Sequence, residues 1–276
     1  MIALIAGTGS LPLEACKALR AQQKDFFVVS LFPEDNLSEL QQATESKADI
    51  ICQPCYKAGA IINLLKERKT EKILMIGKVD KRTLLKKISL DWFAIKILAS
   101  LLYKNDASIM QRIVDELSHQ GMDVIQQDDV LGALLVEPGI LTGTLTPELE
   151  TNIELGMQTA KHLSLCDIGQ TVVVKDKMVL AVEAIEGTDE CIKRGVALGT
   201  SNVVVCKAAH PNQNKRFDLP TLGPTSLAWL KKGDVKAIAW LSTHTFIAQQ
   251  QQFIQKAREL GITLISVADK LPINCR

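Results

Sequence analysis

Short apolar runs alternate with longer amphipathic segments along most of this chain. The runs over residues 2–6, 26–30 and 73–76 are almost wholly apolar, as expected of strands that are buried on both faces. Residues 11–21 and 107–120 instead carry apolar side chains at the spacing of one helix face. Strands that alternate with helices are typical of a largely parallel sheet, so the pattern predicts an α/β fold.

The alternation breaks between residues 130 and 147. There Glu137-Pro-Gly and Leu141-Thr-Gly-Thr-Leu-Thr-Pro place turn-forming residues close together. We therefore predict two α/β domains. A Rossmann-like N-terminal domain over residues 1–132 would bind nucleotide or substrate, and a C-terminal α/β domain over residues 133–276 would carry the catalysis.

The alternating pattern resumes after this break. Residues 171–182 read as two strands joined by a turn at Lys175-Asp176-Lys177. Residues 226–231 are helix-like, and the glutamines over 249–252 lie inside a further helical segment. Three more apolar runs are strand candidates, over 202–206, 235–241 and 263–267. The second half therefore has the same α/β character as the first.

The composition is that of a globular protein with a sizeable core, because 47% of the 276 residues are hydrophobic and 23% are charged. A formal net charge of +1 argues against a protein that holds nucleic acid by its overall charge. Seven cysteines, an odd number, suit a reducing compartment rather than a disulfide framework. We find neither a signal peptide nor an apolar run of about 20 residues, and expect a cytoplasmic protein that acts on small molecules.

One cysteine pair, Cys52-Gln-Pro-Cys55, has the spacing of a redox dithiol or of half a zinc site. No second ligand pair accompanies it in the sequence, and the four histidines show no ligand-like spacing. We therefore expect buried or partly buried free thiols here.

The stretch from Lys207 to Gly223 is the most informative one for chemistry, and it follows the strand predicted over 202–206. Lys207, Arg216 and several amide side chains surround one carboxylate, Asp218, and prolines restrict the loop. Loops at strand ends are where α/β proteins place their chemistry, so this loop is a candidate site for a phosphorylated ligand. An ordinary proline-rich surface connection is the alternative that the spacing leaves open.

A second candidate site is the turn Ala6-Gly7-Thr8-Gly9-Ser10, between the first strand and the first helix. Its glycines would let backbone N–H groups approach a phosphate at the helix start, so Gly7, Thr8 and Gly9 are candidate nucleotide-binding residues. The dinucleotide fingerprint is incomplete, because Pro12 stands where its third glycine belongs and no acidic residue clearly ends the second strand. A nicotinamide site is therefore disfavoured, and a plain tight turn is the alternative.

Two further turns offer polar groups where strands should end. Gly77-Lys78-Val79 follows the strand over 73–76, and Lys104-Asn105-Asp106 precedes the helix over 107–120. Both turns can contact phosphate or ribose. Asp106 is equally suited to cap the helix, and the two roles are compatible.

In the second domain, polar residues follow strand ends at Gln170 and in the run Glu183-Ala-Ile-Glu186-Gly187-Thr188-Asp189. Carboxylates there can hold a divalent cation such as Mg²⁺, which prefers carboxylate and phosphate oxygens. Thr188 and Asp189 also suit a helix start, so capping is the alternative. The candidate substrate-binding residues are Gln170, Glu186, Gly187, Thr188 and Asp189, and the candidate metal ligands are Asp189 and Asp218.

The order of these motifs resembles that of UDP-2,3-diacylglucosamine pyrophosphatases of the LpxI type, over the full length of the chain. The similar stretches are Ile5-Ala-Gly-Thr-Gly-Ser-Leu-Pro, Asp167-Ile-Gly-Gln, Val179-Leu-Ala-Val-Glu-Ala-Ile-Glu-Gly-Thr-Asp and Arg216-Phe-Asp-Leu-Pro-Thr-Leu-Gly. Four motifs in one order are far more specific than a single motif.

The resemblance implies a two-domain α/β hydrolase of lipid A biosynthesis that requires Mg²⁺. The reaction it implies cleaves the diphosphate of UDP-2,3-diacylglucosamine to UMP and 2,3-diacylglucosamine 1-phosphate. By the matching motif, Asp218 is the essential aspartate that activates water with the metal, and we expect Lys207 and Arg216 to stabilise the developing charge. The partner is then a lipid-linked UDP-sugar, with loose association with the inner membrane and homo-oligomer formation left open.

Some positions depart from the family pattern. His210 stands where a lysine is common, and Asn105 and Ala107 interrupt a Lys-Gly-Asp-Asp run. A neutral imidazole is a weaker cation than an ammonium, so these positions are weaker candidates for phosphate contacts. The competing interpretations are a nicotinamide-dependent oxidoreductase and a non-catalytic nucleotide-binding protein, both of which would use the Gly7-x-Gly9 turn.

Overall fold

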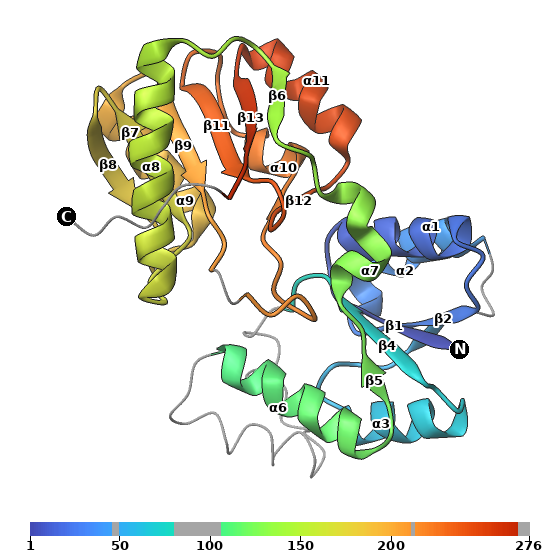
Figure 1. Cartoon of the computed structure of the whole chain (residues 1–276). Coiled ribbons are helices and arrows are strands. Elements are labelled where there is room, and N and C mark those ends of the chain that lie inside the picture. Colours follow the sequence, from blue (N-terminus) through green and yellow to red (C-terminus); the bar gives the residue numbers. More distant parts are fainter. Residues whose placement is uncertain (46–49, 80–105, 211–212, 270–276) are drawn as a thin grey trace. The chain divides into compact units, whose positions relative to one another are not determined.

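The computed structural model describes residues 1–45, 50–79, 106–210 and 213–269 (Figure 1). By its internal contacts, the chain divides into two compact units. Unit 1 comprises Met1–Gly132 together with Asn214–Asp218, and unit 2 comprises Ala133–Gln213 and Leu219–Arg276. The short segment Asn214–Asp218, which follows the unit 2 residues in sequence, thus belongs to unit 1.

Unit 1 is built around a parallel sheet whose described strands have the order β3-β2-β1-β4-β5. The strands are β1 (Ile2–Ala6), β2 (Phe26–Ser30), β3 (Ile50–Cys52), β4 (Lys72–Ile76) and β5 (Asp123–Val124). The helices are α1 (Leu11–Ala21), α2 (Pro33–Thr44), α3 (Ala58–Glu67), α6 (Asp106–His119) and α7 (Gln127–Leu131). The chain runs outward from β1 to β3 and returns to β4 on the other side of β1, as in doubly wound folds.

Helices cover both faces of this sheet, because its strands are apolar on both sides. α3 and α6 pack on the face that carries Phe27, Ile73 and Met75. α1 and α2 lie on the opposite face (Figure 1). The strands predicted over 2–6 and 26–30 and the helix over 11–21 are confirmed at both ends.

Unit 2 contains a mixed sheet of described strands in the order β6-β13-β11-β9-β7-β8 and a small parallel pair, β10-β12. The strands are β6 (Gly139–Thr142), β7 (Thr171–Lys175), β8 (Met178–Val182), β9 (Val203–Lys207), β10 (Thr221–Leu222), β11 (Val235–Leu241), β12 (Phe246–Ile247) and β13 (Thr263–Val267). The helices are α8 (Pro147–Leu165), α9 (Thr188–Gly199), α10 (Pro224–Leu227) and α11 (Gln250–Leu260), and a 3₁₀ turn, η2 (Gly132–Leu134), follows α7.

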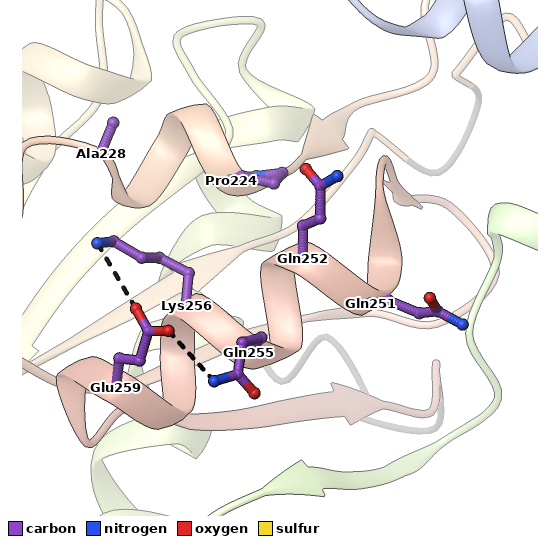
Figure 2. A pocket seen from close by; sticks show the side chains of 7 residues that line it. All are labelled: Pro224, Ala228, Gln251, Gln252, Gln255, Lys256 and Glu259. Carbon is purple, nitrogen blue, oxygen red and sulfur yellow. Dashed lines mark hydrogen bonds and ion pairs between the residues drawn. The ribbon is translucent and has the colours of Figure 1, made fainter.

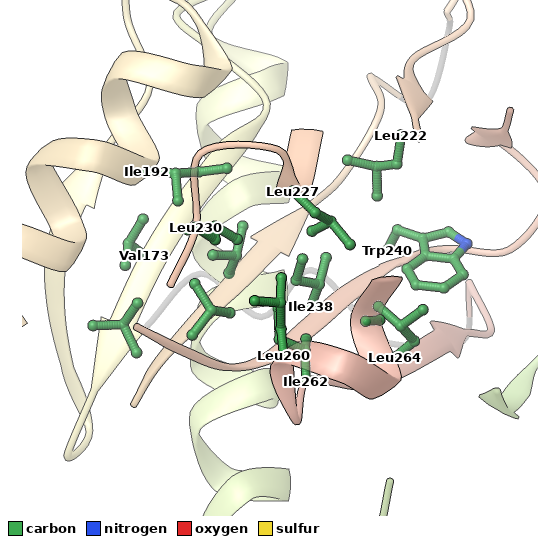
Figure 3. Close-up of a cluster of buried hydrophobic side chains, with 14 of the residues drawn as sticks. Val173, Ile192, Leu222, Leu227, Leu230, Ile238, Trp240, Leu260, Ile262 and Leu264 are labelled. Atoms are coloured by element: carbon green, nitrogen blue, oxygen red, sulfur yellow. The ribbon is translucent and has the colours of Figure 1, made fainter. Parts of the chain in front are cut away.

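The large sheet of unit 2 is also covered on both faces. α8 packs on one face, and Gly156 lets it come close, because a Cβ there would lie 2.4 Å from the Cys206 sulfur. α9, α10 and α11 cover the other face, where Ile238 and Trp240 lie in the buried cluster (Figure 3). The Trp240 ring meets Phe253 edge to face, with 6.3 Å between the ring centres. These contacts bury the face of the central strands that lies opposite α8.

The hairpin predicted over 171–182 is confirmed. β7 and β8 pair antiparallel, and the turn between them holds Asp176 and Lys177 at positive φ of 49° and 61°. Positive φ at both central residues is the mark of a type I′ turn, whose twist matches that of the strands.

Two local predictions need correction. The helix-like segment over 226–231 is shorter and earlier, since α10 ends at Leu227. The Lys231 N–H donates to the Asp234 carboxylate over 2.8 Å, so a side chain closes a turn where the helix was expected. The break between residues 130 and 147 also contains a strand, β6, which pairs antiparallel with β13. This strand was not predicted because turn-forming residues lie on both sides of it.

The α/β class, the two domains and the parallel N-terminal sheet are confirmed. In the described part of the chain, every helix is too short or too polar to cross a bilayer.

Candidate functional site

The carboxyl ends of β1 and β4 meet where the strand order of unit 1 reverses, which is where open α/β sheets bind ligands. Two glycine turns lie there, and Thr8 and Lys78 exchange backbone hydrogen bonds of 2.8 and 2.9 Å between them. A Cβ on Gly7 would lie 2.5 Å from the Lys78 carbonyl oxygen, whereas Gly9, at φ +95°, has open space around it. The structure thus brings together the predicted residues Gly7, Thr8, Gly9, Gly77, Lys78 and Val79.

The end of β2 lies beside this turn and is occupied by neutral groups. The buried Ser30 hydroxyl donates to Asn36 Oδ1 over 3.0 Å, and Asn36 Nδ2 donates to the Gly7 carbonyl over 2.6 Å. An NAD site of the Rossmann type uses an acidic side chain at this strand end to hold the ribose. β2 ends in Ser30 instead, which argues against the nicotinamide interpretation.

The segment that carries Asp218 docks on unit 1 at several points. The Gln127 N–H donates to the Lys215 carbonyl over 2.7 Å, and Lys215 Nζ lies 2.7 Å from Asp128 Oδ2. Asn214 Nδ2 donates to Gln111 Oε1 on α6 over 2.9 Å. The segment forms one turn that ends at Asp218, whose side chain is exposed. Arg216, the other predicted residue of this segment, is half-buried.

Unit 2 holds a buried cation at the end of β9. Lys207 is 6% exposed, and its Nζ donates to Thr188 Oγ1 over 2.9 Å and to Thr171 Oγ1 over 3.3 Å. Thr188 in turn donates to Glu183 Oε1 over 2.9 Å, and Glu183 Oε2 accepts the Gln170 N–H over 3.3 Å. A hydroxyl therefore connects the ammonium to a carboxylate, and such networks hold their members rigidly.

A buried thiol lies next to this network. Burial raises the pKa of Cys191 to about 12, with Glu183 adding to the effect and Arg194 and Lys207 opposing it. A thiol with so high a pKa stays protonated at neutral pH and is no nucleophile. The candidates for chemistry at this edge are therefore Lys207 and the oxygen-bearing side chains around it.

The loop after β9 is tied to the same strand end. Gln170 Nε2 donates to Gln213 Oε1 over 3.3 Å, and the His210 N–H donates to that oxygen over 3.1 Å. In this contact His210 takes part through its backbone N–H rather than its ring. The Gln213 side chain is thus held by Gln170 and by the His210 backbone, one residue before the Asp218 segment.

The remaining predicted residues of unit 2 lie at the start of α9. Gly187 has φ +84° with open space around it, and Asp189 is exposed in the first helical turn. Glu186 forms an ion pair with Arg194. The pKa of Glu186 is lowered by its backbone hydrogen bonds first and by Arg194 second. Glu186 therefore ties the loop to α9 through Arg194.

The described residues contain no group of three or more His, Cys, Asp or Glu side chains that could hold a metal ion by themselves. The two candidate ligands, Asp218 and Asp189, belong to different units. Mg²⁺ usually takes one or two carboxylates and fills its shell with water and substrate phosphate, so it needs no such cage. An exposed carboxylate such as Asp218 suits that chemistry. Asp106 opens α6, and Lys104 lies outside the described residues.

The chain is similar to known proteins over nearly its whole length. The LpxI N-terminal domain matches residues 1–134, and the LpxI C-terminal domain matches residues 137–265. The chain belongs to the LpxI family. One LpxI relative, from Caulobacter vibrioides, is named UDP-2,3-diacylglucosamine pyrophosphatase LpxI. It is 27% identical over 281 residues, which cover 96% of this chain and 97% of the relative. The resemblance inferred from the motifs is therefore confirmed.

Two residues that contact predicted site residues or their segment, Thr171 and Asp128, could not be identified from the residues around them in the sequence. Thr171 faces Lys207 because β7 and β9 pair antiparallel in that register. Asp128 meets Lys215 across 87 positions of the chain. Strand pairing would have pointed to Thr171, but only the folded structure identifies Asp128.

A surface groove of about 550 Å³ on this LpxI chain lies along α10 and α11 (Figure 2). Its polar side chains bond to one another, Gln255 with Glu259 over 3.2 Å and Lys256 with Glu259 over 3.8 Å. Its lining residues are Pro224, Ala228, Gln251, Gln252, Gln255, Lys256 and Glu259. They include none of the predicted site residues, so we assign the groove no part in the chemistry.

Proposed function

We propose that this chain hydrolyses the diphosphate of UDP-2,3-diacylglucosamine to UMP and 2,3-diacylglucosamine 1-phosphate, a step of lipid A biosynthesis. The observation that carries the proposal is the match of both LpxI domains, which together span nearly the whole chain. The name of the Caulobacter vibrioides relative supports the substrate. The order of the four motifs supports the same reading.

Asp218 is the proposed catalytic carboxylate. It positions the attacking water and accepts its proton, and its exposure on a strand-end loop supports that role. Mg²⁺, when bound, supplies a Lewis acid that neutralises charge on the phosphate oxygens. Asp218 is the side chain that would hold it, with Asp189 as the second candidate. Loss of one such carboxylate typically removes several kcal/mol of transition-state stabilisation.

Lys207 and Arg216 are proposed to stabilise the negative charge that develops on the phosphate oxygens. The hydrogen bonds from Lys207 to Thr188 and Thr171 support this role, because a cation held rigidly out of water needs little reorganisation during the reaction. Arg216 brings a planar guanidinium, which suits phosphate oxygens. The remaining substrate-binding candidates are Gly7, Thr8, Gly9, Gly77, Lys78, Val79, Lys104, Asp106, Gln170, Glu186, Gly187, Thr188 and Asp189.

The substrate carries two acyl chains, and these chains favour a lipid surface. We therefore propose that the chain acts in the cytoplasm and meets its substrate by loose contact with the inner membrane. A homo-oligomer is compatible with this role.

The direct test is release of UMP from UDP-2,3-diacylglucosamine by the purified chain, followed by chromatography. We expect release with Mg²⁺, loss of release with EDTA, and recovery when Mg²⁺ is added in excess. Binding of NADH, measured in parallel by fluorescence, should be undetectable. A folded chain that releases no UMP would contradict the hydrolase proposal, whereas release that survives EDTA would contradict only the metal requirement.

A further inference from the structure

The proposed catalytic aspartate is presented by a segment that leaves its own half of the chain. The chain departs from unit 2 after Gln213, contributes Asn214–Asp218 to unit 1, and returns to unit 2 at Leu219. Ordering these five residues costs conformational entropy, which their contacts with unit 1 help to offset.

Within the segment, Asp218 is linked directly to Asn214. The Asn214 carbonyl accepts the N–H of Asp218 over 3.0 Å and that of Phe217 over 3.2 Å. Asn214 Oδ1 accepts the Arg216 N–H over 3.1 Å. The segment is therefore a single hydrogen-bonded turn. Contacts that hold Asn214 and Lys215 in place also orient Asp218.

The surface that receives this turn is itself well anchored. Gln127 Nε2 donates to the Met75 carbonyl at the end of β4 over 2.8 Å. The start of α7 is closed by a capping box between Gln126 and Asp129. Asp128 lies between these anchors, so its carboxylate offers a fixed point for a cation.

Lys215 supplies that cation. Lys215 Nζ lies 2.7 Å from Asp128 Oδ2, and the two side chains are 34% and 16% exposed. The other carboxylate oxygen, Oδ1, is buried and has no hydrogen-bond partner within the described part of the chain. A partly buried carboxylate of this kind depends on its cation far more than an exposed one does. The pair is therefore the ion pair that holds this turn on unit 1, beside the hydrogen bonds from Gln127 and to Gln111.

We propose that Lys215 and Asp128 are positioning residues for the hydrolysis, which act by fixing the Asp218 turn on unit 1. This inference rests on the proposed function, because it assigns the catalytic carboxylate to Asp218. Neither residue touches the reacting atoms in this scheme. Their loss should lower kcat and leave KM nearly unchanged, because the groups on this turn, Asp218 and Arg216, are proposed to act on the transition state.

The test compares Lys215→Glu with the charge-exchanged double variant Lys215→Glu/Asp128→Lys. We expect Lys215→Glu to lower kcat for UMP release by a factor of about 10 or more with KM within about twofold, and the exchange to restore kcat to within about threefold. A matched control is Lys256→Glu, which breaks the more exposed Lys256–Glu259 pair (Figure 2) and should leave kcat unchanged. Thermal unfolding reports whether each variant is folded.

Hydrogen exchange of the backbone amides of Phe217 and Asp218 gives a readout that does not need activity. We expect faster exchange in Lys215→Glu and wild-type protection in the exchanged variant. Unchanged kcat despite faster exchange, or restored protection without restored kcat, would overturn the positioning role. If the wild type releases no UMP, the proposed function fails, while protection that is insensitive to Lys215→Glu would show that the docking contact itself is wrong.

Discussion

At the ends of their strands, unit 1 offers backbone turns and exposed side chains, whereas unit 2 buries a charged one. In unit 1, the Gly7 and Gly77 turns hydrogen-bond to each other, and Lys78 and Asp218 reach solvent. In unit 2, Lys207 is 6% exposed and is held by Thr188 and Thr171. The predicted site residues of unit 1 therefore contribute little to the stability of that unit, whereas Lys207 contributes to the stability of unit 2.

This difference has a physical consequence. An exposed side chain can be replaced with little effect on folding, because water solvates the substitute as well. A buried cation in a hydrogen-bond network cannot, since its removal leaves partners without compensation. Function and stability should therefore separate in unit 1 and change together in unit 2.

The largest effect is expected at Asp218. Asp218→Asn removes the proposed carboxylate and should lower kcat for UMP release by a factor of about 10³, with an unchanged thermal midpoint because the side chain is exposed. Asp176→Asn is the control, because Asp176 lies in a type I′ turn that accepts asparagine. Near-normal turnover by Asp218→Asn would remove this residue from the chemistry.

Replacing the two lysines separates the two edges directly. Lys207→Met should lower kcat/KM by a factor of about 100 and destabilise unit 2 by about 3 kcal/mol, because Glu183 and Thr188 lose their cation. Lys78→Met should weaken substrate binding without any change in stability, since Lys78 is exposed. Urea unfolding and steady-state kinetics measure both. Equal stability of the two variants would show that Lys207 stabilises unit 2 no more than Lys78 stabilises unit 1.

The glycines of unit 1 test the edge through its backbone. Gly7→Ala should destabilise unit 1 by about 2–3 kcal/mol, because the new Cβ would lie 2.5 Å from the Lys78 carbonyl oxygen. Gly9→Ala should cost about 1 kcal/mol, from its φ of +95° alone. Urea unfolding measures both variants. A Gly9→Ala variant less stable than Gly7→Ala would show that the Gly7 turn is not closely packed.

The smallest expected effects are differences in the labelling of two cysteine thiols, one at a strand end of unit 1 and one beside the Lys207 network of unit 2. The labelling rate of each thiol depends on how deeply it is buried. Cys52 ends β3 and is exposed, which corrects the expectation of a buried or partly buried thiol there, while Cys191 is buried beside the Lys207 network. Burial raises the pKa of Cys191 to about 12, so this thiol stays protonated from pH 7 to pH 9. Iodoacetamide at pH 8, followed by mass spectrometry, should label Cys52 in the folded protein and Cys191 only after unfolding. Equal labelling rates would mean that the unit 2 edge opens readily.

The sequence predicts well those parts of the fold whose pattern is local. β1, α1, β11 and β13 follow from runs of apolar residues with a single period. β6 could not be predicted, because a short edge strand with exposed Gly139 and Ile140 has no alternation that survives among turn residues. The turn that replaces the expected helix beyond α10 includes a side-chain contact from Asp234 to the Lys231 N–H.

For the candidate site as well, some features could be predicted from the sequence and others could not. The glycine turns and the Asp218 loop could be found from composition and motif order. The Lys207 network needs the antiparallel register of β7 and β9, and the Lys215–Asp128 pair needs two segments 87 residues apart to meet. Neither relation leaves a periodic trace in the sequence, because each depends on the folded arrangement of separate elements.

The central claim is that water, activated at Asp218, cleaves the diphosphate of UDP-2,3-diacylglucosamine. The most direct measurement is the reaction of the wild-type chain with Mg²⁺ in ¹⁸O-labelled water, followed by ³¹P NMR and mass spectrometry. We expect equal amounts of UMP and 2,3-diacylglucosamine 1-phosphate, with one ¹⁸O atom in one of the two phosphates. Intact substrate in the presence of folded protein, or products that contain no ¹⁸O, would contradict it.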